Sequence, residues 1–365
     1  MSLRLLKLVL RVGKILAVAP SYHDIKNQTF PSKIYGCLMA SLLTFGVGVS
    51  VGFRAADYAK FFTMKLIVQV LLDGTLYVLN IYSILKIPYK KFHWNKLIKS
   101  IQKFDKNNKV KEKSKYGSFV LANAVFFCYQ LYMTCLLSRT IGIKFYKQFA
   151  IEYLQLYDQF VINFLLYVFL TMLITRQKCL RLKFETQIAK NSTLVQFDTI
   201  KHDVCLLKEI SEIINDIFGW PLFLTIAFTT LQMIMYLQLL AIIPYLQLPY
   251  LICLASVILW QCVSTLINIF LCDVASNQGK KILTVAHTLE KYLPNENPHM
   301  YQFIMVVEDS IPHFSAARFF QVGRNTICGI FNVVITFLIV MIQFKMNEKV
   351  TSRLERCKNG SVDNM

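Results

Sequence analysis

The stretch "TFLIVMIQF", residues 336–344, indicates how this chain folds. Seven of its nine residues are strongly apolar, and it ends an apolar run that begins near Ile327. A run of about 20 apolar residues is long enough to cross a lipid bilayer as one helix. Thr336 and Gln343 interrupt the run, and a buried amide costs about 4 to 8 kcal/mol in an alkane-like medium unless a partner satisfies it. The stretch therefore predicts a membrane-spanning helix with polar surroundings along one face.

Six further apolar blocks have a similar length. Of the 365 residues, 55% are hydrophobic and 17% are charged, whereas a soluble domain carries about 25% charged residues. A helix satisfies its own backbone hydrogen bonds in lipid, so the blocks predict an all-α polytopic membrane protein with seven transmembrane helices. The predicted spans are 34–54, 66–87, 118–138, 150–175, 219–243, 247–273 and 325–344.

Lys and Arg residues favour one orientation. Four alternate segments outside the spans contain 28 of them, and the other four contain 11. The richer segments are 1–33, 88–117, 176–218 and 274–324. Because cytoplasmic segments carry the basic excess, we expect the N-terminus to be cytoplasmic and the tail at 345–365 to be extracellular. The net charge of +19 is therefore read as a topology signal and not as a nucleic-acid surface.

The N-terminal segment, 1–33, is predicted to contain an amphipathic helix. Arg4, Lys7, Arg11 and Lys14 are spaced by three, four and three residues, which places them on one helical face. Such a face suits the anionic lipid of the inner leaflet.

No catalytic or metal-binding pattern is apparent. The ten cysteines form no CxxC pair, the six histidines are scattered, and no nucleophile and base lie at a catalytic spacing. We expect no enzymatic activity, catalytic residue, cofactor or metal site.

The last span carries its polar residues on one stripe. Asn325, Asn332, Thr336 and Gln343 fall within about 40° of one another at 100° per residue. Val340 and Phe344 lie beside this stripe. The stripe can face water or another polar surface, or it can hydrogen-bond neighbouring helices and hold them together.

Three other spans have similar stripes, which we expect to meet in a cavity in the outer half of the membrane. The stripes are Gln69, Asp73, Tyr77 and Asn80; Glu152, Gln155, Gln159 and Asn163; and Thr225, Thr229, Gln232 and Tyr236. Acidic side chains at membrane depth are candidate functional residues because their burial is costly. The predicted ligand-binding residues are Gln69, Asp73, Tyr129, Tyr132, Glu152, Gln155, Gln232 and Tyr236. Simple hydrogen-bonding between helices remains the alternative.

Three stretches resemble the insect gustatory receptor family, which is related to insect odorant receptors. "TFLIVMIQF" resembles its signature of Thr-Tyr, five mostly apolar residues and Gln-Phe, with Phe337 in place of the tyrosine. "LLKEISEIINDIFGWPLFLTI" (206–226) is similar to the family's entry into its fifth span. "HFSAARFFQVGRNTI" (313–327) is similar to its short cytoplasmic helix before the last span.

The resemblance implies a ligand-gated cation channel assembled as a homo- or heterotetramer in the plasma membrane of chemosensory neurons. Residues 34–273 would form the six-helix bundle that holds a ligand pocket. Residues 274–324 would form a cytoplasmic anchor segment, and 325–344 would line the pore. The pore residues would be Asn332, Thr336, Val340, Gln343 and Phe344, with the last two at the constriction.

The ligand class is indicated by one position. Sugar-type members of the family resemble one another in a glutamate directly after the Thr-Tyr pair, where this chain has Leu338. A bitter or other non-sugar tastant is therefore preferred as the small-molecule partner. Two other classes stay open: a G-protein-coupled receptor, which would have its N-terminus outside, and a membrane transporter, which would need an internal repeat or broken helices.

Overall fold

The structure is a computed structural model that describes residues 3–20, 30–59, 63–108, 116–189, 197–242, 248–292 and 298–360. Seven helices are long and apolar enough to cross a membrane, as the sequence predicts. Four predicted spans, 34–54, 66–87, 118–138 and 325–344, agree with the apolar parts of their helices to within two residues at either end. The other three, 150–175, 219–243 and 247–273, fall on helices that extend further at one or both ends. The helices are α1 (Leu3–Ile15), α2 (Phe30–Tyr58), α3 (Thr63–Leu85), α4 (Lys91–Asn108), α5 (Tyr116–Ile141), α6 (Lys144–Ala189), α7 (Phe197–Ile242), α8 (Leu248–Tyr292), α9 (Pro298–Asp309) and α10 (Arg324–Gly360).

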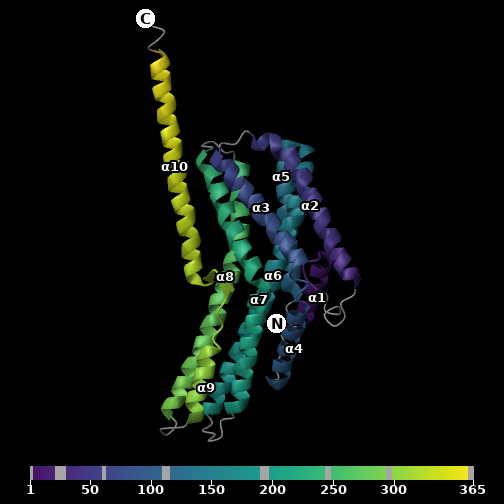
Figure 1. The fold of residues 1–365 in the computed structure, drawn as a ribbon, viewed down its shortest axis with the longest axis vertical. Helices are drawn as coiled ribbons and strands as arrows, with labels where there is room; N and C mark the ends of the chain where they lie inside the picture. Colours follow the sequence, from purple (N-terminus) through teal and green to yellow (C-terminus); the bar gives the residue numbers. More distant parts are fainter. Residues whose placement is uncertain are drawn as a thin grey trace.

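Three helices are much longer than a bilayer requires. α6 and α7 have 46 residues each and α8 has 45, which corresponds to roughly 70 Å, whereas the hydrocarbon core is about 30 Å thick. Their extended ends, joined by α9, form a second packed region at the lower end of the molecule (Figure 1). The three helices therefore connect the transmembrane bundle to this second packed region.

The basic segment at 88–117 contains α4, which is not fully solvated. Its apolar residues recur at helical spacing, and this face packs against α6 and α7. Trp94 and Phe104 are fully buried, and the Trp94 indole N–H donates to the carbonyl of Ile87 at 2.9 Å. Lys96 lies on the outer side and pairs with Glu209 of α7 at 2.7 Å.

The N-terminal helix α1 packs against protein through its apolar face. Leu5, Leu6, Val9 and Leu10 are fully buried, and α1 contacts α6 and α5. The four basic residues, Arg4, Lys7, Arg11 and Lys14, share the exposed face that their spacing predicts. The basic face is therefore turned away from α5 and α6.

The stretch at 313–323 differs from the helix that its resemblance suggested. It contains a short antiparallel hairpin of β1 (Ser315–Ala316) and β2 (Phe320–Gln321), and α10 begins only at Arg324. The hairpin turns through Ala317 and Arg318, whose φ angles of 50° and 66° are left-handed and interrupt a helix. The short helix of segment 274–324 is α9, which lies earlier in the chain.

The last helix is attached to the bundle along one side. It contacts α7 and α8 through a face that includes the buried Ile330, Val334 and Met341. Figure 1 shows α10 at one edge of the molecule, with its C-terminal part extending away from the other helices. The backbone of the tail continues as helix from residue 345 to Gly360, and residues 361–365 lie outside the described part.

Candidate functional site

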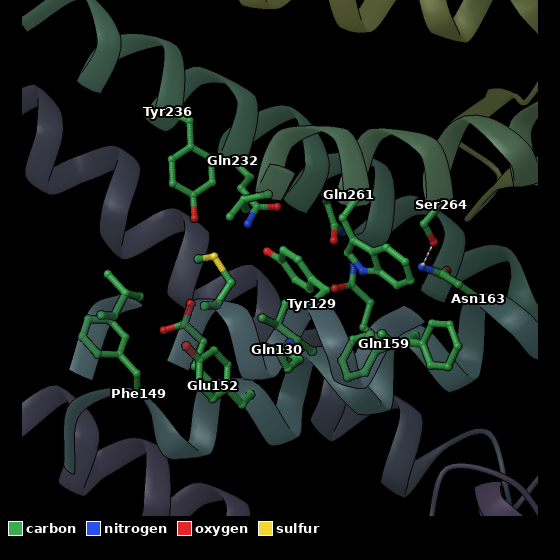
Figure 2. Close-up of a pocket in the computed structure, with 18 residues that line it drawn as sticks. Tyr129, Gln130, Phe149, Glu152, Gln159, Asn163, Gln232, Tyr236, Gln261 and Ser264 are labelled. Carbon is green, nitrogen blue, oxygen red and sulfur yellow. Dashed lines mark hydrogen bonds between the residues drawn. The ribbon is translucent and has the colours of Figure 1, made fainter. Parts of the chain in front are cut away.

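A cavity of about 110 Å³ lies between α5, α6, α7 and α8. Each of the four helices contributes polar residues to a wall that is otherwise aromatic and aliphatic. Figure 2 shows Tyr236 and Gln232 entering from α7, opposite Glu152 and Phe149 of α6. The lining residues are Phe126, Tyr129, Gln130, Met133, Leu137, Phe149, Glu152, Tyr153, Leu156, Gln159, Phe160, Asn163, Gln232, Tyr236, Val257, Trp260, Gln261 and Ser264.

Four of the eight residues proposed from the sequence line this cavity, and the other four lie elsewhere. Those in the wall are Tyr129, Glu152, Gln232 and Tyr236. Tyr132 is 42% exposed on the outer side of α5. Gln155 is buried at 5% exposure, but it is not among the lining residues. Gln69 and Asp73 lie in a separate polar cluster that adjoins Glu152.

This cluster, which we call the Arg54 cluster, joins α2, α3 and α6. It consists of Arg54, Tyr58, Gln69, Asp73 and Glu152. The Arg54 guanidinium lies 3.5 Å from the Asp73 carboxylate and 3.4 Å from the Glu152 carboxylate. Tyr58 and Gln69 donate to the two oxygens of Asp73 at 2.5 and 2.9 Å. Asp73 thus has its hydrogen bonds satisfied within the cluster.

Polar residues of three helices also bind one another directly, and two of them, Asn163 and Ser264, belong to the cavity wall. Thr229 of α7 lies 2.7 Å from the hydroxyl of Thr265 of α8. Asn163 of α6 donates to Ser264 at 3.4 Å, as Figure 2 shows, and its carbonyl accepts from Asn268 at 3.3 Å. These bonds serve the helix-joining role that was the alternative for the polar stripes.

The sequence interpretation missed the contribution of α8 and of Arg54. Trp260, Gln261 and Ser264 line the cavity, and Thr265 and Asn268 continue the same face of α8. Gln261, Ser264, Thr265 and Asn268 are spaced by three or four residues and form a polar stripe in the span 247–273. The periodicity that revealed the other stripes would have revealed this one too. Arg54 was counted only as a topology signal, although a basic residue at a span end also pairs readily with acids at the same depth.

A second, wider crevice of about 400 Å³ adjoins the first. It lies between α5, α6 and α8, and Leu121, Val125, Val263 and Ile267 make much of its wall apolar. Phe160, Asn163, Trp260 and Ser264 line both spaces. The first cavity is therefore separated from the crevice by a shared wall that contains two aromatic rings.

The polar stripe of α10 faces away from its own bundle. Asn325, Asn332, Thr336 and Gln343 are exposed, and Val340 is half-buried. At 100° per residue they lie about 160° from the face of Ile330, Val334 and Met341 that packs on α7 and α8. The side chains of Asn332, Thr336 and Gln343 form no hydrogen bond within the described part of the chain. Phe344 belongs to the backbone of α10, but its side chain lies outside the description.

A family model and two solved structures of chemosensory receptors resemble this chain. The family model described as 7tm Chemosensory receptor matches residues 6–348. The insect olfactory receptor OR5 from Machilis hrabei, solved in complex with eugenol, has the same fold with a TM-score of 0.65 and 14% identity over 93% of this chain and 98% of that chain. A second structure of OR5 gives a TM-score of 0.64 and 11% identity over 93% and 97% of the two chains. No curated protein sequence matches the chain.

Proposed function

Because this chain belongs to the 7tm chemosensory receptor family, we propose that it is a gustatory receptor that works as a ligand-gated, non-selective cation channel. It is a multi-pass membrane protein from a family of receptors, not of enzymes. Its N-terminus and the anchor segment 274–324 are cytoplasmic in this proposal, and its tail is extracellular. It works in the plasma membrane of chemosensory neurons.

The observation that carries the proposal is the polar stripe of α10. A stripe of amides and a hydroxyl on a membrane-spanning helix needs water or polar partners, because each uncompensated amide costs about 4 to 8 kcal/mol in hydrocarbon. The stripe points away from the rest of the subunit, so the chain itself does not satisfy it. Placing α10 around a central water-filled pore in a homo- or heterotetramer would solvate the stripe.

In this arrangement Asn332, Thr336 and Val340 line the pore, and Gln343 and Phe344 form its constriction. The Gln343 amides of neighbouring subunits can bond one another when the pore is closed, since each has donors and an acceptor. A ring of Phe344 would block ions by excluding water from a narrow apolar passage. Opening requires the last helices to spread or rotate.

The cavity between α5, α6, α7 and α8 is the ligand site of the proposal. Tyr129, Glu152, Gln232 and Tyr236 contact the ligand directly. Gln69 and Asp73 act through Arg54, whereas Tyr132 and Gln155 lie outside the cavity wall and make no direct contact in this proposal. OR5 carries eugenol in one of its structures, and a small organic molecule is the corresponding partner here. Because Leu338 replaces the glutamate of sugar-type members, a bitter or other non-sugar tastant is preferred.

Whole-cell recording in a heterologous cell tests the function. A library of tastants is applied to cells that express the chain, and current is expected within milliseconds of an active compound. The current should persist in excised patches without nucleotide, since a channel needs no G protein. A response that disappears in excised patches would favour the G-protein-coupled alternative. An N-terminal epitope tag that stains intact cells would reverse the proposed orientation.

A further inference from the structure

The cavity wall contains an acidic side chain and no basic one. Glu152 is the one acidic residue among those that line the cavity, and no Lys, Arg or His lies in the lining. Its side chain keeps 29% of its surface exposed, so Arg54 does not cover it. A ligand in the cavity therefore meets a carboxylate and no basic group.

The Arg54 cluster leaves this charge at Glu152 and not at Asp73. Arg54 is one cation shared between two carboxylates at similar distances. Asp73 also accepts hydrogen bonds from Tyr58 and Gln69. Among the described residues, Glu152 accepts a hydrogen bond from Arg54 alone. The cluster has a formal charge of −1, and the less satisfied carboxylate is the one that lines the cavity.

Two rings provide an apolar platform in the same cavity wall. Tyr129 of α5 and Trp260 of α8 are stacked, with ring centroids 5.8 Å apart and an angle of 15° between their planes. Phe149 and Tyr236 add rings to the wall close to Glu152 (Figure 2). Aromatic faces attract organic ammonium groups through the ring quadrupole, most strongly where water is excluded.

Buried amide oxygens supply further acceptors. Gln130 and Gln232 are 9% and 6% exposed, and the side-chain oxygen of each has no hydrogen-bond partner among the described residues. Both residues line the cavity. Buried acceptors without partners are costly, by about 1 to 3 kcal/mol each, so a ligand that donates to them gains affinity. An ammonium group has up to three N–H donors and no acceptor.

We propose that the cavity selects small organic cations, in which a protonated amine binds Glu152 and an apolar ring or chain packs on Tyr129 and Trp260. The ammonium N–H groups donate to the Glu152 carboxylate and to the amide oxygens of Gln130 and Gln232. The inference rests on the proposed function, since it names the ligand class of the same pocket. A neutral polyhydroxylated ligand is the competing occupant, because amides, a carboxylate and aromatic rings also suit hydroxyl groups.

The test compares two compounds of the same shape. 2-Phenylethylamine is protonated at pH 7, and 2-phenylethanol is neutral. Each is titrated against the full-length protein in lipid nanodiscs, with the shift of the thermal unfolding midpoint as the readout. The amine is expected to bind at least about 10-fold more tightly than the alcohol. The difference reflects one charge-assisted hydrogen bond that the amine makes and the alcohol lacks.

Variants at Glu152 separate charge from fold. Glu152→Gln should reduce the preference for the amine to less than about 3-fold, whereas Glu152→Asp, which keeps the charge, should retain most of it. Glu308→Gln, on the exposed surface of α9, is the matched control and should leave the preference unchanged. Equal binding of amine and alcohol, binding of neither, or an unchanged preference in Glu152→Gln would each reject the proposal. Binding of sucrose in place of the amine would reject it in favour of the polyhydroxylated occupant.

Current recordings distinguish this inference from the channel function on which it rests. Selective amine binding without any current would leave the ligand class standing and reject the channel. Currents evoked by neutral compounds, with none from the amine and no amine binding, would reject the ligand class and leave the channel standing.

Discussion

Asn215 of α7 holds Ser315 of β1 through two hydrogen bonds. Its side-chain nitrogen donates to the Ser315 hydroxyl at 3.1 Å, and its side-chain oxygen accepts from the Ser315 backbone N–H at 2.8 Å. One turn further along α7, the carbonyl of Gly219 accepts from the backbone N–H of Ala317 at 3.0 Å. The hairpin that leads into α10 is thereby fixed to α7.

The same helix contributes to the cavity. Gln232 follows Asn215 by 17 residues of α7, which is about 25 Å along a helix. The start of α10 is also tied to α8 by the Arg324–Asp273 ion pair at 2.8 Å. A displacement of α7 or α8 by a ligand would therefore reach the last helix through specific contacts, and this route can be interrupted by substitution.

Asn215→Ala is expected to weaken the connection between ligand and pore. It removes both bonds to Ser315, each of which contributes about 0.5 to 1.5 kcal/mol. The maximal ligand-evoked current should fall, while the midpoint shift produced by a bound ligand should stay the same because Asn215 lies far from the cavity. Recording currents and thermal unfolding on the same variant checks both.

Thr288→Ala is a suitable control for Asn215→Ala. It removes one side-chain bond, to the carbonyl of Thr284, on the exposed surface of α8. It should change neither current nor ligand binding. If Asn215→Ala carried currents equal to those of the Thr288→Ala protein, the hairpin contact would have no part in gating.

Gly219→Ala is expected to displace the hairpin. A Cβ atom at this position would lie 3.2 Å from the carbonyl oxygen of Ser315, which is closer than a normal contact. Strain of this kind costs about 1 to 3 kcal/mol, which exceeds the roughly 1 kcal/mol that alanine gains over glycine within a helix. The unfolding midpoint should fall, and the current should change with it.

Gly74→Ala provides the comparison, because the Cβ it would add meets no atom within 4 Å apart from its chain neighbours and the adjoining backbone of its own helix. There alanine should be neutral or stabilising. Equal midpoints for the two variants would mean that the contact at Gly219 is loose.

The transmembrane architecture was predictable from the sequence because it depends on long local patterns. The block from Ile327 to Phe344 is apolar over the length of a bilayer, and such blocks form helices whatever their partners are. The polar stripes were predictable for the same reason, since helical periodicity alone places Glu152 on one face with Gln159.

Contacts between distant segments could not be predicted from local patterns. Ala317 and Arg318 adopt left-handed backbone angles in a hairpin whose backbone is bound by α7. Neither alanine nor arginine is a residue type that indicates such a turn in the sequence. The pairing of Arg54 with Asp73 was not predicted, because their separation of 3.5 Å depends on how α2 and α3 pack. The two stretches 206–226 and 313–327, recognised separately, prove to be two sides of one contact.

Arg54→Gln is expected to destabilise the transmembrane bundle. Arg54 is 7% exposed and pairs with Asp73 and Glu152, so its removal leaves two carboxylates close together without a cation. Removing one partner of a buried ion pair costs about 3 to 5 kcal/mol. The unfolding midpoint should fall, and the double variant Arg54→Gln/Asp73→Asn should recover part of the loss. No change in the single variant, or no recovery in the double variant, would show that the cluster is hydrated and contributes little.

Thr336→Cys is expected to react with a water-soluble thiol reagent, whereas Val334→Cys is not. Thr336 is exposed on the stripe of α10, and Val334 is 2% exposed against α7 and α8. If the stripe lines a pore, the reagent reaches position 336 when ligand opens the channel, and the current falls irreversibly. The parent chain, which has a native exposed cysteine at Cys328, supplies the baseline.

Gln343→Leu should then change conduction and not assembly. Replacing the amide with an apolar group of similar size removes polar lining near the constriction, so single-channel conductance should fall or cation permeability ratios should shift while surface expression persists. A stripe that only joins helices predicts the reverse, because lost interhelical hydrogen bonds, worth about 0.6 to 2 kcal/mol each, lower assembly and expression and leave conductance as it was. Reduced expression with unchanged conductance, together with an unreactive Thr336→Cys during activation, would therefore remove α10 from the pore.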